Sequence, residues 1–186
     1  MRLDNRFQVF EDIIEEMTYV YKHDNRPWLI GYSGGKDSSL LVSLVVETVL
    51  RLPEHERTKK IFIVTSDTGV ENPVVKRYMH TSSQKINEFS SRFSANIRAD
   101  IIYPDVAQSY WSLVIGLGYP TPEPPGFRWC TERLKILPMN RYTNSIIEKH
   151  GEVVLLLGVR KQKVLQGEEV LFQEKLKANF LHLIQT

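Results

Sequence analysis

The stretch WLIGYSGGKDSSLLVSLVV, residues 28–46, joins two apolar runs through Ser-Gly-Gly-Lys-Asp-Ser. The first run, residues 28–32, ends at glycine and serine and is typical of a buried strand. The second run continues over residues 39–50, is apolar on nearly all sides, and predicts a deeply placed helix. A strand that turns directly into a helix puts backbone N–H groups, two serine hydroxyls and Lys36 at the helix's positive end. We therefore expect an anion at residues 33–38.

Two common phosphate-binding patterns do not fit this loop. The Walker pattern G-x-x-x-x-G-K-[ST] fails because position 30 is isoleucine and position 37 is aspartate. The dinucleotide pattern G-x-G-x-x-G fails because Gly31, Gly34 and Gly35 have the wrong spacing. The plain alternative is a tight turn whose serine only caps the helix. Lys36 and Asp37 inside the same turn favour the anion site over that alternative.

Strands alternate with helices along the chain. Apolar spacing and end signals predict further helices over residues 6–23, from Pro73 to about residue 89, and over 140–150. Further strands are predicted over residues 61–64, 97–103 and 153–157. Asn72 is expected to cap the helix that Pro73 begins. The predicted buried face of this helix consists of Val74, Val75, Tyr78, Met79, Ile86 and Phe89. This order predicts an α/β fold, a parallel twisted sheet flanked by helices, with ligands at the carboxyl ends of the strands.

Composition excludes several classes of protein. The 186 residues are 42% hydrophobic and predict a single cored domain, and a formal charge of +2 does not by itself call for nucleic acid. Cys130 is the single cysteine, which excludes an internal disulfide framework and a metal site built from cysteine alone. No apolar run approaches the roughly 18 residues of a membrane span, and the amino terminus has no secretory signal. We expect a soluble, reduced, cytoplasmic protein without membrane partners.

A proline-rich segment follows the third predicted strand. Four of the nine prolines fall within residues 120–125, which excludes regular helix or a central strand there. The segment predicts either a surface connection or a stiff substrate loop, and the basic and aromatic residues after it favour the loop at least equally.

Four blocks of the sequence carry a resemblance to a known family. SGGKDS (33–38) resembles the loop of the PP-loop ATP pyrophosphatases, which cleave ATP between its α and β phosphates. SDTGVENPVV (66–75), GYPTPEPPGFRWCTERLKI (118–136) and LLLGVRK (155–161) resemble the phosphoadenylyl-sulfate-reductase-like branch. Within that branch they are most similar to the DndC and SspD families of bacterial DNA phosphorothioation sulfurtransferases. The resemblance implies an adenine nucleotide alpha hydrolase-like, Rossmann-like domain over residues 1–160. Apolar spacing predicts a helical tail over 161–186, which departs from the family pattern and is either truncated or divergent.

The resemblance implies a nucleotide site with ATP and Mg²⁺. The loop residues that would wrap the β and γ phosphates are Ser33, Gly34, Gly35, Lys36, Asp37 and Ser38. Lys36 would balance phosphate charge and Asp37 would help to hold Mg²⁺. Asp67 and Gly158 would lie beside the nucleotide, and Arg160 would contact the α phosphate as charge develops. Asp67 has the alternative of an ordinary turn aspartate before glycine.

The resemblance also implies a substrate or sulfur-transfer region, for which the candidates are Arg128, Cys130, Arg133 and Lys135. The cations are candidate contacts to a nucleic-acid backbone. Trp129 either stacks a base or anchors the loop in the core. Cys130 is an inert thiol, a sulfur carrier, or one ligand of an iron–sulfur cluster, although the further cysteines of cluster-binding relatives are missing.

The function that these residues imply is adenylylation of a DNA phosphate oxygen with release of pyrophosphate, followed by sulfur insertion. The expected partners are DNA, a cysteine desulfurase and other subunits of a phosphorothioation complex. Three alternatives stay open: a reductase of adenylylated sulfate, a tRNA-thiolating enzyme, and a nucleotide-binding scaffold without turnover.

Overall fold

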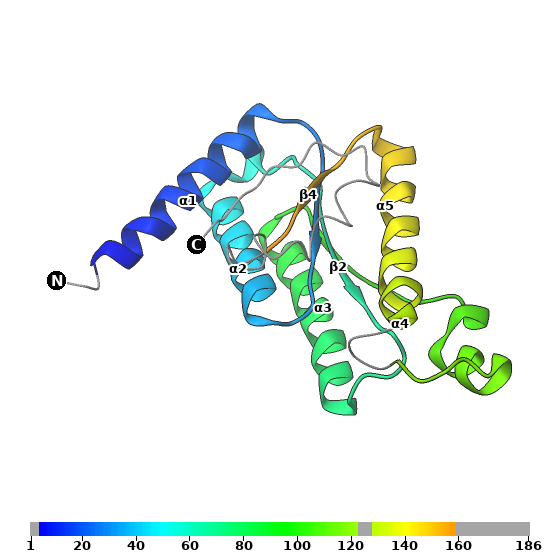
Figure 1. Cartoon of the computed structure of the whole chain (residues 1–186). Helices are drawn as coiled ribbons and strands as arrows, with labels where there is room; N and C mark the ends of the chain where they lie inside the picture. The colour runs from blue at the N-terminus through cyan, green and yellow to red at the C-terminus, as the bar shows by residue number, and fades with distance from the viewer. Residues whose placement is uncertain (1–3, 123–127, 159–186) are drawn as a thin grey trace.

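The computed structural model describes residues 4–122 and 128–158 and contains one four-stranded sheet (Figure 1). Its strands are β1 (Trp28–Gly31), β2 (Ile61–Ser66), β3 (Ile97–Ile102) and β4 (Val154–Leu156). The order across the sheet is β3-β2-β1-β4, and every pairing is parallel. The predicted strands and the predicted α/β class are therefore confirmed.

Helices cover both faces of the sheet. One face carries α1 (Asp4–His23), α2 (Lys36–Arg51) and α3 (Pro73–Phe93), and the other carries α5 (Leu137–His150), as Figure 1 shows. Successive strand residues point to opposite faces, so Ile30 packs in the larger core with α1 and α2. Its neighbour Leu29 packs in the smaller core with Ile146 of α5. Burial on both faces explains why these strands are continuous apolar runs.

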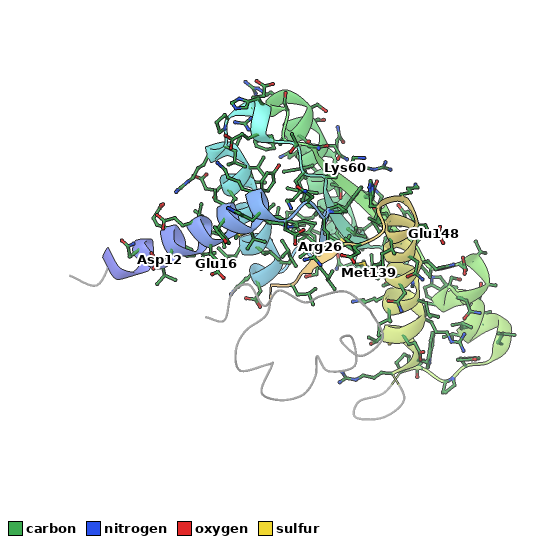
Figure 2. All side chains as sticks on the ribbon, turned by 90° about the horizontal axis from the view of Figure 1, so that it is seen from above. Asp12, Glu16, Arg26, Lys60, Met139 and Glu148 are labelled. Carbon is green, nitrogen blue, oxygen red and sulfur yellow. The ribbon has the colours of Figure 1, made fainter. Side chains whose placement is uncertain are left out.

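The first helix packs mainly on α2, and its Tyr21 ring also contacts Trp28 of β1. Ile14, Met17 and Tyr21 are buried at helical spacing, as the sequence pattern predicts. Asp12 and Glu16 are exposed on the outer side of the same helix (Figure 2). An amphipathic first helix therefore covers the outside of α2, which explains why α2 is apolar on nearly all sides.

The chain changes direction across the sheet next to β1. From β1 it passes through α2 to β2 and through α3 to β3, and it then returns by α5 to β4 on the other side of β1. In open parallel sheets, ligands bind outside the carboxyl ends of the strands at such a reversal. Residues 33–38 follow the carboxyl end of β1 and lie at that point.

The cap of α3 is confirmed, but part of its predicted buried face is not. The Asn72 side-chain oxygen accepts the N–H of Val74 at 2.9 Å, and Pro73 begins the helix. Met79 is buried, whereas Val74 and Tyr78 are 75% and 51% exposed. The 21 residues of α3 span about 32 Å, while the six of β3 span about 20 Å, so one end of the helix has no sheet beside it.

The chain from residue 129 onward differs from expectation. Helical structure was predicted from residue 140, but it begins at α4 (Trp129–Thr131), widens into a π-helical turn, η4 (Glu132–Ile136), and continues as α5. The N–H of Leu137 donates to the carbonyl of Glu132, which is the wider π pattern. Pro138 lacks an N–H, and the wider turn before it reduces the clash that proline causes inside a regular helix. Residues 129–136 are therefore helix and not loop.

The remaining elements are short. They are η1 (Glu54–Glu56), η2 (Val106–Gln108) and a second π-helical turn, η3 (Ser112–Gly116). Among the helices described, none has the length and apolarity that crossing a membrane would require.

Candidate functional site

The loop after β1 leaves the start of α2 open to an anion. The helix begins at Lys36, earlier than the sequence pattern suggests, and no side-chain hydrogen bond caps it at Gly35. Lys36 is exposed and Asp37 lies in the first turn. The first N–H groups of an α-helix have no partner inside the helix, so an uncapped start attracts negative charge. This geometry suits the predicted phosphate site.

Two serines give the loop its shape. The N–H of Ser33 donates to the Ser38 hydroxyl at 3.3 Å, and the two hydroxyl oxygens lie 3.2 Å apart. The Ser38 hydroxyl also donates to the carbonyl of Gly35 at 3.1 Å. Ser38 is buried and Ser33 is exposed. Ser38 therefore holds the loop from inside, while Ser33 is accessible to a ligand.

A tyrosine of α3 packs beside the loop. Gly34 has a left-handed φ of 71°, and a Cβ atom there would lie 3.1 Å from the Tyr78 ring. The hydroxyls of Tyr78 and Tyr32 lie 3.2 Å apart. The sequence pattern assigned Tyr78 to the buried helix face, and only its position next to Gly34 shows that it supports the loop.

Gly158 brings the end of β4 against the same loop. A Cβ atom on residue 158 would lie 2.7 Å from the carbonyl oxygen of Asp37 and 3.4 Å from Cβ of Leu41. Gly158 therefore allows close backbone packing, and its predicted contact with nucleotide stays a prediction. Arg160 and the tail over residues 161–186 lie outside the described residues, so their predicted roles also stay predictions.

A cavity of about 330 Å³ opens beside the loop at the carboxyl ends of the strands. Its polar lining comes from Ser33, Ser66, Glu71 and Lys135. Its apolar lining includes Val64, Val75, Met79, Ile136 and Met139. Apolar walls with a few polar groups are typical of sites for small organic ligands, and this volume is at the small end of their range. The cavity is the candidate pocket for the organic part of a nucleotide.

The carboxylate of Asp67 is buried and faces α3. It accepts the N–H of Gly69 at 2.9 Å, and its other oxygen lies 3.2 Å from Nζ of Lys76 and 3.5 Å from Nε2 of His80. Burial would raise the pKa of Asp67, but hydrogen bonding to Gly69 and Lys76 outweighs it and holds the pKa below its usual value. Lys76 and His80, one helical turn apart, are partners that the sequence analysis missed.

Glu71, close to Asp67 in the sequence, stabilises the turn before α3. Its carboxylate accepts hydrogen bonds from the backbone N–H of Thr68 at 3.0 Å and from the Thr68 hydroxyl at 2.6 Å. Glu71 lines the cavity, as does Ser66, which the sequence analysis also missed. The side chains of Glu71 and Ser66 are therefore better placed to contact a ligand in the cavity than the carboxylate of Asp67 is.

The four residues predicted for substrate or sulfur transfer lie on or beside one helix but do not form a single strip. Lys135 lines the cavity beside the loop. The Arg133 guanidinium contacts the side-chain oxygen of Gln108 and lies 5.9 Å from the Tyr119 ring. Arg128 is exposed at the start of α4, and Cys130 is partly exposed. Of the four, Lys135 is the one that the fold brings to the candidate nucleotide cavity.

Trp129 anchors its segment in the core. The side chain is 4% exposed, stacks on Tyr110 with ring centroids 5.7 Å apart, and donates from Nε1 to the carbonyl of Pro120 at 2.9 Å. The structure therefore agrees with the anchoring alternative for Trp129. Because the ring is buried, it is not available to stack a base.

The residues present fit Mg²⁺ with nucleotide better than they fit an iron–sulfur cluster. A carboxylate such as Asp37, together with phosphate oxygens and water, is the usual environment of Mg²⁺. A cluster is generally held by about four ligands, most often thiolates, and this sequence offers Cys130 alone. In residues 4–122 and 128–158, no three His, Cys, Asp or Glu side chains gather as a metal site.

Comparisons with known proteins add a likeness of fold. No family model matches the chain, and no curated protein sequence matches it. Among solved structures, the U34-tRNA thiolase NcsA from Methanococcus maripaludis, determined with its [4Fe-4S] cluster, is similar with a TM-score of 0.45 and 16% identity. The aligned region covers 90% of this chain and 52% of the thiolase chain, so this chain spans about half of that protein's length. At this identity, what the two chains share is a general arrangement of strands and helices.

Proposed function

We propose that this chain is an ATP pyrophosphatase of the PP-loop type that adenylylates an oxygen on a nucleic acid before sulfur is inserted. One observation carries the proposal. The uncapped start of α2, with Ser33, Ser38 and Lys36, stands next to a cavity of about 330 Å³ where the chain reverses across the sheet. A polyphosphate and an adenosine group would fill these two neighbouring spaces.

The residues of the loop would share the work of the first step. Backbone N–H groups and Lys36 would hold the β and γ phosphates, and Asp37 would help to hold Mg²⁺. A nonbridging oxygen of the acceptor phosphate would form a bond to the α phosphorus while the bond to the β phosphate breaks. Pyrophosphate would leave with the bonding electrons. The acceptor oxygen is already ionised, so positioning and charge stabilisation would supply the catalysis and no general base is required.

The acceptor is the part of the proposal that needs a separate experiment. A DNA backbone phosphate is the acceptor that the sequence resemblance implies. A persulfide from a cysteine desulfurase would then attack the adenylylated phosphorus and displace AMP, and a thiol reductant would cleave the S–S bond to leave the phosphorothioate. A tRNA base is the second candidate, since the same loop would serve a thiolase such as the one NcsA is named for. Incubation with ATP, a cysteine desulfurase, radioactive cysteine and each polymer would show which one takes up sulfur.

The loop is tested by measuring the products of ATP turnover with Mg²⁺ and the acceptor. Pyrophosphate and AMP are expected, and Lys36→Ala or Asp37→Ala should abolish both. Lys85→Ala is the matched control, because Lys85 is an exposed lysine of α3 that does not line the cavity. Release of inorganic phosphate in place of pyrophosphate would contradict the proposal. Nucleotide binding without turnover would favour the scaffold alternative.

A further inference from the structure

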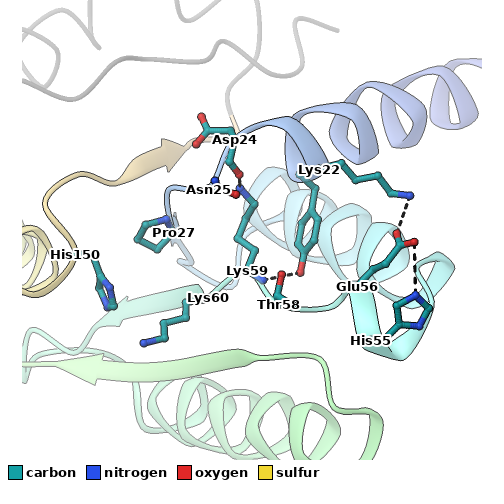
Figure 3. Close-up of a pocket in the computed structure, with 11 residues that line it drawn as sticks. Lys22, Asp24, Asn25, Pro27, His55, Glu56, Thr58, Lys59, Lys60 and His150 are labelled. Carbon is teal, nitrogen blue, oxygen red and sulfur yellow. Dashed lines mark hydrogen bonds and ion pairs between the residues drawn. The ribbon is translucent and has the colours of Figure 1, made fainter.

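A second depression lies at the opposite end of the strands, where β1 and β2 begin (Figure 3). It has a volume of about 570 Å³ and is lined by residues that precede β1 and β2, together with His150 at the end of α5. The six residues of β2 run between this end and the candidate nucleotide cavity, a distance of about 20 Å. The depression is therefore separate from the loop and its cavity.

The acidic side chains around this depression are paired. Asp24 contacts the Arg26 guanidinium at 2.5 Å. Glu56 contacts Nζ of Lys22 at 2.7 Å, as Figure 3 shows. Lys60 lines the same depression and has no ion-pair partner within the described part of the chain. The fixed negative charges are thus compensated, and the lysine charge that is left over faces the depression.

Lys59 adds a buried donor to the lining. Its side chain is 6% exposed and donates to the backbone carbonyls of Asp24 and Arg26, the latter at 3.2 Å. The ammonium has three N–H groups, so these two bonds leave one for a ligand. The rings of Tyr21 and Trp28 lie 5.4 Å from the same nitrogen and hold it in place.

A neighbouring depression of about 450 Å³ extends the first one. The two share Lys60 and His150 in their linings, so they meet at these residues. The second adds Lys149 and Arg98, and its one acidic side chain, Asp100, contacts Arg98 at 2.8 Å. We call these two adjoining depressions together the amino-edge groove.

We propose that the amino-edge groove binds the phosphate backbone of a nucleic acid. The groove consists of two adjoining depressions, its acids are paired, and each depression has cations in its lining, with Lys60 and Lys149 exposed. Such an arrangement favours a polymer with regularly spaced charges over a small anion, for which the cations would converge on one point. The proposal does not depend on what residues 33–38 bind, because no residue lines both the groove and the cavity beside that loop.

The test is fluorescence anisotropy of a labelled oligonucleotide with the full chain in the absence of ATP. The double variant Lys60→Ala/Lys149→Ala should bind about 10-fold more weakly at moderate salt, because two phosphate contacts are lost. The slope of log affinity against log salt should fall by about 1.4 for a single strand or about 1.8 for a duplex. Lys85→Ala, which removes an exposed lysine outside the groove, should bind as the unmodified chain does.

Three further measurements keep the result interpretable. Circular dichroism of each variant verifies that folding is unchanged, and Lys36→Ala, which disables the loop, should retain oligonucleotide binding. Inorganic phosphate is added as competitor at the same total phosphate concentration as the oligonucleotide, and it should not displace the polymer. Equal binding by the double variant, equal weakening by Lys85→Ala, or displacement by phosphate at matched concentration would each overturn the proposal.

Discussion

Gly158 lies directly against Asp37, so that a Cβ atom on residue 158 would be 2.7 Å from the Asp37 carbonyl oxygen. Gly158 follows β4, and Asp37 belongs to the first turn of α2. The contact therefore joins the ends of β4 and β1, the two neighbouring strands between which the chain reverses direction. The position of the helix start, and hence of its N–H groups, depends on the absence of a side chain at residue 158.

The first prediction concerns this contact. Gly158→Ala should lower the free energy of unfolding by about 1–3 kcal/mol through overpacking. It should also weaken ATP binding more than this loss of stability explains, because the start of α2 must shift. Urea denaturation and calorimetric titration with ATP measure the two effects. Gly116→Ala is the control, since no atom lies within 4 Å of its added Cβ, and equal behaviour of the two variants would refute the prediction.

The second prediction concerns Gly34. Gly34→Ala combines a left-handed φ of 71° with a contact of 3.1 Å to the Tyr78 ring. The backbone conformation alone should cost about 1–2 kcal/mol. Gly34→Ala should therefore weaken ATP binding. Adding Tyr78→Ala removes the ring contact but not the backbone strain, so the double variant should recover only part of the lost ATP affinity. Full recovery of ATP affinity would mean that the backbone conformation of Gly34 is unimportant. No recovery would mean that the contact with the Tyr78 ring is unimportant.

The third prediction concerns the buried carboxylate of Asp67. Its pKa is lower in the folded protein than the ordinary value of 3.8, so the folded state favours the ionised form. The stabilisation is present above the unfolded pKa and is lost as pH falls through the folded pKa. Asp67→Asn should lower the free energy of unfolding at neutral pH by about 1–3 kcal/mol. It should also flatten the decline of stability below about pH 4.

Urea denaturation across this pH range measures both effects. Glu88→Gln is a suitable control, because Glu88 is an exposed carboxylate of the same α3 helix that Asp67 contacts. An Asp67→Asn curve parallel to that of the unmodified protein at acidic pH would contradict the assignment.

The fourth prediction separates structure from ligand binding at Trp129. Trp129→Phe keeps an aromatic ring next to Tyr110 but loses the hydrogen bond to the carbonyl of Pro120. The free energy of unfolding should fall by about 0.5–1.5 kcal/mol. Trp129→Ala should cost about 3–5 kcal/mol. Trp129 does not line the candidate nucleotide cavity, so ATP affinity of the folded Phe variant should be unchanged, and a large loss would contradict its anchoring role.

Local sequence determined most of the secondary structure. The strands are continuous apolar runs because both faces of a parallel sheet are buried, and such runs are visible without any knowledge of contacts. The cap at Asn72 and the proline after it are equally local signals. Residues 33–38 are a local signal in the same way, since a strand that turns into a helix through Ser-Gly-Gly-Lys-Asp-Ser favours an anion as the occupant. These features depend on neighbours in the sequence.

Tertiary structure decided which side chains meet. Lys135 faces the cavity while Arg133 contacts Gln108, because a π-helical turn sets the directions of these two nearby residues. Lys60 and His150 line the same groove although they are 90 positions apart, because β2 begins where α5 ends. The spacing of residues in the sequence does not reveal such contacts between distant residues, since these contacts depend on strand order and helix placement. The sequence by itself determined the strands and most of the helices and singled out residues 33–38, and the packing of the sheet decided the surroundings of that loop.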